Sequence, residues 1–143
     1  MDHVVYLDYK AKELFNLKSG QKSMIIRGAM GRKLPYGKVN IGDVLYFIEN
    51  KGDGLVKAKA IVSDVFNSDQ LAKDDSMKLV EANQTKLMLD KGLVNRFGGK
   101  RYLVLISVID FKEIENFKID KSNFGNMDDW LPVENINDIL FGS

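Results

Sequence analysis

Six basic side chains and no acidic one lie between Leu14 and Gly42 of this 143-residue chain. They are Lys18, Lys22, Arg27, Arg32, Lys33 and Lys38. Lysine supplies a point charge, whereas arginine supplies a planar fork of N–H donors that fits a phosphate or the edge of a base. The segment therefore predicts an anion-binding cleft whose ligand is RNA or a nucleotide.

The charges of the whole chain almost cancel, because its formal net charge is +1. The segment from 107 to 143 is the acidic counterpart, with eight acidic residues against three lysines. A concentrated positive region attracts anions even when the total charge is near zero. The pattern thus favours one localised anion-binding site over non-specific binding of anions to the whole surface.

The stretch KSMIIR, residues 22–27, is expected to be extended. Because side chains alternate along a strand, Ser23, Ile25 and Arg27 share one face, and Arg27 and Ser23 can approach one ligand. Lys22 then stands at the mouth of the strand as a point charge. In the alternative interpretation, Arg27 pairs with a structural carboxylate and Lys22 is merely solvated.

A long loop, residues 27–37 (RGAMGRKLPYG), follows this strand. Long loops in compact domains are more often functional than decorative. Gly28 and Gly31 allow backbone N–H groups to approach a phosphate, and Tyr36 can stack on a base. Further charge comes from Arg32, Lys33 and Lys38. The alternative is a flexible, solvated loop in which Tyr36 packs on its own proline.

Hydrophobic periodicity and turn residues predict five or six strands and two or three short helices. The clearest strands are 4–7, 23–28, 42–50, 54–66 and 100–111, and the helical segments are 10–20, 68–83 and 90–99. The turn NKGDG predicts a hairpin between the third and fourth strands. The near-continuous apolar run at 100–111 indicates a strand buried on both faces. The expected fold is α+β, built on a small, strongly curved mixed sheet or barrel.

One domain, residues 1–143, is expected from the length of the chain. Its C-terminal segment, 110–143, has turn residues, aromatics and acids but no clean period. We interpret this segment as an ordered loop that packs back on the barrel through Phe124 and Trp130.

Composition excludes several kinds of site. The chain has no cysteine and one histidine, His3, so no disulfide, thiolate zinc site or histidine cluster is expected, and no metal or cofactor is assigned. No apolar run approaches the roughly 20 residues of a membrane helix, and the N-terminus does not resemble a signal peptide. A cytoplasmic protein without a membrane partner is the expectation.

The order of these elements resembles the ASCH domain, a branch of the PUA-like superfamily of small β-barrels. The resemblance covers Tyr6 to about Ile109. Its core is a G-x-K-[ST]-x-x-x-R run followed by a Gly-Asp dipeptide, here Gly20, Lys22, Ser23, Arg27, Gly42 and Asp43. The resemblance implies a cleft between the barrel and the helices, with RNA or a modified nucleoside as ligand.

One branch of this family is similar to small amidohydrolases that deacylate N4-acetylcytidine. Carried over by position, the lysine of that mechanism falls on Lys22, the arginine on Arg27 and a helix carboxylate on Asp75. A threonine of the pattern falls on Ile25, which has no hydroxyl to attack a carbonyl. This departure counts against the amidohydrolase mechanism.

Three hypotheses follow. The first is an RNA- or nucleotide-binding module whose ligand contacts Lys22, Arg27, Arg32, Lys33, Tyr36 and Lys38. The second is a metal-independent hydrolase of a modified nucleoside or of RNA, with catalytic Lys22, Ser23 and Asp75, or with a hydroxyl from Tyr46 or Ser122. The third is a protein-interaction domain in which the basic cleft receives an acidic peptide.

Overall fold

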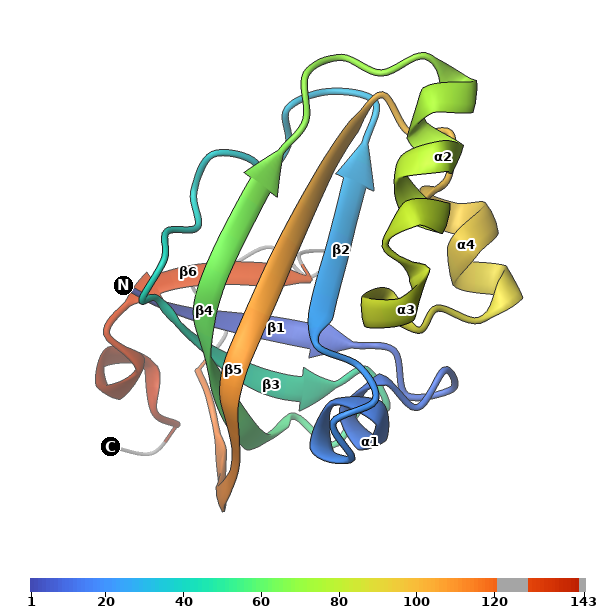
Figure 1. Ribbon diagram of the computed structural model, residues 1–143. Helices are drawn as coiled ribbons and strands as arrows, with labels where there is room; N and C mark the ends of the chain where they lie inside the picture. Colours follow the sequence, from blue (N-terminus) through green and yellow to red (C-terminus); the bar gives the residue numbers. More distant parts are fainter. Residues whose placement is uncertain (121–128, 142–143) are drawn as a thin grey trace.

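Six strands form a single sheet in the order β2-β5-β4-β3-β1-β6 (Figure 1). The computed structural model describes residues 1–120 and 129–141. Within them the strands are β1 (Asp2–Leu7), β2 (Met24–Ala29), β3 (Val44–Glu49), β4 (Leu55–Asn67), β5 (Tyr102–Lys118) and β6 (Trp130–Glu134). The pairs are antiparallel except β1 with β3, so the sheet is mixed, as expected.

The sheet curls because its two longest strands are bulged. The pairing of β4 with β5 shifts register at three places, between Val56 and Ala58, between Lys59 and Ile61, and between Val62 and Asp64. Each bulge bends a strand and increases its twist. As a result β1, β3 and β6 run crosswise behind β4 and β5 (Figure 1), which confirms the small, strongly curved sheet.

Four short α-helices occur in the described residues, rather than the two or three expected. They are α1 (Glu13–Lys18), α2 (Lys73–Ala82), α3 (Gln84–Leu87) and α4 (Lys91–Phe97), with a 3-10 turn η1 (Ile136–Ile139) near the end of the chain. Helices α2 to α4 lie together beside β2 (Figure 1). None of the described helices is long and apolar enough to span a bilayer.

The helix expected at 68–83 begins five residues later than its sequence suggests. Ser68 is buried beside β5, where its backbone N–H donates to the carbonyl of Leu103 and its Oγ accepts from the Leu103 N–H. Ser68 therefore continues a strand-like pairing and does not cap a helix. The helical segment also divides at Asn83 into α2 and α3.

Alternation along β2 and β5 builds two cores, one on each face of these strands. Ile25, Val104 and Ile106 pack inside the curled sheet with Trp130. The opposite face carries Met24, Ile26, Leu103 and Leu105, which pack against the helices. Burial on both faces confirms the expectation for the apolar run that forms β5.

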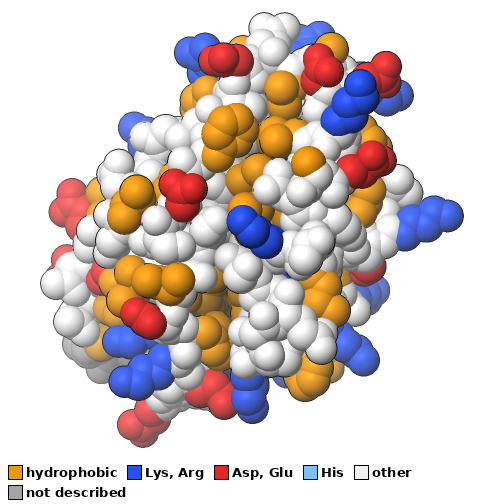
Figure 2. All heavy atoms as spheres, viewed as in Figure 1, with side chains coloured by type: hydrophobic (Ala, Val, Ile, Leu, Met, Phe, Trp, Pro, Cys, Tyr) orange, Lys and Arg blue, Asp and Glu red, His pale blue; other side chains and the backbone are white. Residues whose placement is uncertain are grey.

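The second half of β5 is only partly buried: Phe111 packs against the inner core, and Ile114 and Phe117 pack against a third cluster that includes Val56 and Leu131. The outer face of the sheet carries exposed apolar side chains. Ile61, Phe66 and Ile109 of β4 and β5 are exposed. In the view of Figure 2, hydrophobic side chains lie in patches over the β4–β5 face, with charged side chains between and around them.

Much of the segment 110–143, expected as a loop, forms sheet. Residues 110–118 extend β5 against β4, where Leu55 is paired with Lys118, and Trp130–Glu134 form β6 against β1. The side chain of Trp130 is buried in the inner core. The sequence lacks a clean period here because neither face of the outer half of β5 is deeply buried. Ser122 and Phe124 lie outside the described residues.

A buried chain of three polar side chains ties β1 to its neighbours. Trp130 Nε1–H donates to His3 Nδ1 at 3.0 Å, and His3 Nε2 lies 2.8 Å from Asp43 Oδ2. Indole nitrogen is only a donor, so Nδ1 must accept and Nε2 must carry the proton that His3 donates to Asp43. The Asn40 N–H donates to the same carboxylate. Asp43, which the resemblance places in the Gly-Asp dipeptide, is thus a structural acceptor.

We predict that Asp43→Asn lowers the free energy of unfolding at pH 7 by about 1 to 3 kcal/mol, because His3 and Asn40 lose a charged acceptor. Burial opposes ionisation, but hydrogen bonds from Asn40, from His3 and from the N-terminal ammonium hold the pKa of Asp43 below its usual value. A depressed folded pKa gives stability that is complete above the ordinary carboxyl pKa and is lost as pH falls through the folded value. Urea titrations at several pH values from 3 to 7 measure both effects.

The matched control is Asp69→Asn, which changes an exposed aspartate. It should alter stability by less than about 0.5 kcal/mol. Equal effects of the two substitutions would show that the His3–Asp43 contact contributes nothing specific.

Candidate functional site

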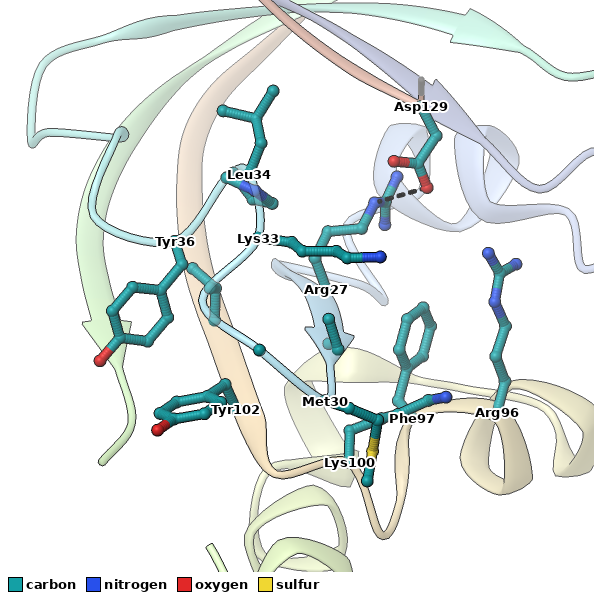
Figure 3. A pocket seen from close by; sticks show the side chains of 15 residues that line it. Arg27, Met30, Lys33, Leu34, Tyr36, Arg96, Phe97, Lys100, Tyr102 and Asp129 are labelled. Carbon is teal, nitrogen blue, oxygen red and sulfur yellow. Dashed lines mark ion pairs between the residues drawn. The ribbon is translucent and has the colours of Figure 1, made fainter. Parts of the chain in front are cut away.

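A cleft of about 400 Å³ opens between the end of β2, the loop that follows it and α4 (Figure 3). Its described lining includes four basic side chains, Arg27, Lys33, Arg96 and Lys100, and one carboxylate, Asp129. Apolar and aromatic walls come from Met30, Leu34, Pro35, Tyr36, Phe97, Tyr102 and Val104. A volume of this size is typical of small-ligand sites, which are roughly 300 to 1,000 Å³.

Arg27 forms the floor of the cleft and is 8% exposed. Its Nη1 donates to the carbonyl of Ile26 at 2.8 Å, and its Nη2 donates to the carbonyl of Tyr6 at 2.6 Å. Its Nε lies 3.3 Å from Asp129 Oδ2, but the geometry is not that of a hydrogen bond, and this buried nitrogen has no hydrogen-bond partner among the described residues. The guanidinium also lies 5.7 Å from the centre of the Trp130 ring.

These contacts make Arg27 a link between the two edges of the sheet. β2 is one edge strand and β6 is the other. Arg27 belongs to β2, whereas Asp129 and Trp130 lie at the start of β6 and the Tyr6 carbonyl belongs to β1. Two roles of Arg27 were expected as alternatives, and the structure combines them. Arg27 pairs with a carboxylate and also lines the cleft.

The remaining cations line the cleft from separate elements. Lys33 comes from the loop after β2, Arg96 from α4, and Lys100 from the turn before β5. In Figure 3 the Lys33 side chain extends across the cleft toward Arg27, and Phe97 stands between Arg27 and Arg96. The Arg96 guanidinium lies 5.3 Å from the centre of the Phe97 ring. A bound anion would meet charge from three sides.

Tyr36 lines the cleft, but its ring is already packed. Its hydroxyl donates to the carbonyl of Ser68 at 2.6 Å, and its ring meets Tyr102 edge to face at 5.6 Å. Arg32 is exposed, and its guanidinium lies 5.8 Å and 5.5 Å from the centres of these two rings. Arg32 and Lys38 do not contribute to the described cleft lining, and both are exposed to solvent.

The two glycines of the loop have different roles. A Cβ at Gly28 would meet Leu103 Cδ2 at 2.8 Å and the Lys100 side chain at 3.3 Å, so Gly28 permits β2 to approach β5 and its preceding turn. A Cβ at Gly31 would meet open space. The space around Gly31 therefore does not itself require a glycine.

Lys22 lies elsewhere, beneath the helices, and is 2% exposed. Its Nζ donates to the carbonyl of Leu87 in α3 and lies 3.9 Å from Glu13 Oε2 in α1. Burial lowers the pKa of Lys22 to about 8, while Glu13 opposes this shift and the charge of Arg27 adds to it. Lys22 is thus a partly desolvated amine and not a solvated point charge at the mouth of a strand.

The structure brings two of the three expected catalytic residues to one place. Lys22 and Ser23 both line a cavity of about 140 Å³. This cavity shares no described lining residue with the cleft beside Arg27. Asp75 is exposed on α2 and is not among the residues that line either cavity. Ile25 is buried in the inner core, and the carboxylate beside Lys22 belongs to Glu13.

Glu13, beside Lys22, and Arg96, in the cleft, were not recognised from the sequence. Glu13 and Leu17 are the buried positions of α1. The i,i+4 spacing of Glu13 and Leu17 was the available clue. Arg96 reaches the cleft only because α4 packs beside β2, and no local pattern marks it.

The fold is similar to the crystal structure of an ASCH protein from Zymomonas mobilis, with a TM-score of 0.67 and 14% identity over 92% of this chain and 87% of that one. Two mutant forms of the Zymomonas protein align with the same TM-score, at 15% identity over 89% and at 14% identity over 87% of their chains. No family model matches the chain, and no curated protein does. The comparison confirms the ASCH-like α+β fold that the sequence resemblance implied.

We predict that the free energy of unfolding rises by about 1 to 2 kcal/mol between pH 8 and 9.5 because of Lys22. The unfolded chain keeps Lys22 protonated up to about pH 10.4, whereas the folded chain releases the proton near pH 8. Stability rises with pH wherever the unfolded state binds more protons. Urea titrations at pH 7.5, 8.5 and 9.5 measure the slope.

Lys22→Met should remove this rise, whatever its effect on stability at pH 7.5. The matched control is Lys78→Met, because Lys78 is an exposed lysine of α2. A rise that persists in Lys22→Met would assign the titration to another group.

Proposed function

We propose that the protein binds a ribonucleotide unit, free or within single-stranded RNA, in the cleft between β2 and α4. The observation that carries the proposal is the set of cations that converge on this one concave site, Arg27, Lys33, Arg96 and Lys100. Clustered lysine and arginine supply the electrostatic attraction for phosphates.

Three of these cations are available to a ligand. Within the described residues, Lys33, Arg96 and Lys100 form no ion pair with a carboxylate. Arg27 differs, because its two terminal nitrogens are bonded to backbone carbonyls. We therefore assign phosphate binding to Lys33, Arg96 and Lys100, and assign to Arg27 the rigid positive floor of the cleft.

The walls suit a planar base. The Arg96 guanidinium over Phe97 and the exposed side chain of Met30 are surfaces on which a base can stack. Tyr36, whose hydroxyl and ring are both engaged, supports the wall of the cleft. Its role in the proposal is to position the loop that carries Lys33.

The geometry favours binding over hydrolysis. The Lys22 amine points to the Leu87 carbonyl beneath α3, and it lines a different cavity from the one that collects the cations. Asp75 is not beside it. The amidohydrolase arrangement of Lys22, Ser23 and Asp75 is therefore not the basis of the proposal.

We predict salt-sensitive binding of a short single-stranded RNA, measured by fluorescence polarisation from 50 to 200 mM salt. Each phosphate contact contributes about 0.7 to the slope of log affinity against log salt for a single strand. Lys33→Ala and Lys100→Ala should each weaken binding and flatten the slope by about that amount. The same titrations with a polyglutamate peptide test the alternative of an acidic protein partner.

Lys78→Ala is the control, since it removes an exposed lysine of α2 that does not line the cleft. Its slope should equal that of the unmodified protein. Salt-independent RNA binding, or equal losses in Lys78→Ala and Lys33→Ala, would contradict a binding site in the cleft. Stronger binding of the peptide than of RNA would favour the protein partner.

A further inference from the structure

Asp129 places a carboxylate in a cleft whose other described charged residues are cations (Figure 3). Its side chain is 46% exposed, and Oδ2 lies 3.3 Å from Arg27 Nε. A carboxylate repels phosphate and attracts N–H donors. The cleft therefore has two chemically different parts, an acceptor at Asp129 and a cationic part at Lys33, Arg96 and Lys100.

Arg27 holds this carboxylate without using up its acceptor capacity. The two terminal nitrogens of Arg27 are bonded to the carbonyls of Ile26 and Tyr6, and only Nε faces Asp129. That approach is an ion pair without hydrogen-bond geometry. The carboxylate is also anchored through its backbone, because the Tyr6 N–H donates to the Asp129 carbonyl at 3.0 Å. The backbone of Asp129 is anchored, and its carboxylate keeps lone pairs for a ligand.

The four RNA bases differ in what they can offer such an acceptor. Guanine presents two adjacent N–H donors, N1–H and the N2 amino group, which match the two oxygens of one carboxylate. Adenine and cytosine each present an amino group beside an acceptor nitrogen, and uracil presents one N–H between two carbonyls. Paired hydrogen bonds to a charged group are stronger and more selective than single ones.

We propose that the cleft selects guanine, with the Watson–Crick edge of the base on the Asp129 carboxylate and the phosphate toward Lys33, Arg96 and Lys100. This inference rests on the proposed function and adds the identity of the base. Asp129 is then the specificity-determining residue, and the three cations bind every nucleotide alike.

The test compares guanosine and inosine 5′-monophosphates, which differ only in the N2 amino group, by calorimetric titration of the whole chain at low salt. We expect guanosine monophosphate to bind about tenfold more tightly, the effect of one hydrogen bond to a charged group. Asp129→Asn should bring the two affinities to within about twofold, because an amide offers one acceptor oxygen in place of two. The same variant should bind inorganic phosphate more tightly.

Lys100→Ala is the matched control. It should weaken binding of both nucleotides by the same factor and leave their ratio unchanged. RNA pentamers with one central guanine or inosine among adenines repeat the comparison for a base within a strand. A thermal melt of Asp129→Asn shows whether its fold is intact.

The outcomes separate the two claims. Binding of both nucleotides with equal affinity would overturn guanine selection and leave the proposed function standing. A guanine preference that survives in a folded Asp129→Asn protein would overturn the role of Asp129. If neither nucleotide nor either pentamer binds, the proposed function itself fails.

Discussion

The guanidinium of Arg27 joins the two free edges of a curled sheet. It belongs to edge strand β2, donates to a carbonyl of β1, and contacts Asp129 and Trp130 at the start of edge strand β6. A cation buried this deeply needs compensating partners, and here two backbone carbonyls accept from Nη1 and Nη2 while the Asp129 carboxylate lies beside Nε. Meeting that need brings the edges together and fixes the floor of the cleft, so the same contacts that close the sheet also place the acceptor Asp129.

The basic segment that suggested one anion site is divided by the alternation of a single strand. Odd positions of β2 face the interior of the curled sheet, which places Ile25 in the inner core and Arg27 at the cleft. Even positions face the helices, and Lys22, just before the strand, lies on that side against Leu87. Basic residues that are close together in the sequence thus lie in different environments when they fall on opposite faces of one strand.

Local patterns predicted strands β1 to β5, the β3–β4 hairpin and the doubly buried half of β5. These features depend on neighbours in the sequence, namely apolar runs and the turn residues between them. The tail was harder to interpret, because the outer half of β5 has no deeply buried face and so shows no period.

The composition of the candidate site could be predicted only in part. Arg27, Lys33 and Tyr36 were recognised from a single basic segment. Arg96 and Asp129 come from α4 and from the start of β6, and only the tertiary fold brings them to the cleft. Glu13 was missed for a related reason, since an acid beside a buried lysine cannot be told from a surface acid until α1 is packed against its neighbours.

The most direct test of the cleft as the binding site is to follow a ¹⁵N-labelled sample by nuclear magnetic resonance as guanosine 5′-monophosphate is added. The account predicts that the Arg27 Nε–H signal and the backbone amides of Gly31 and Lys100 shift with increasing ligand. Shifts at Gly20 and Ser23, which line the cavity beside Lys22, without any at Gly31 or Lys100 would contradict it.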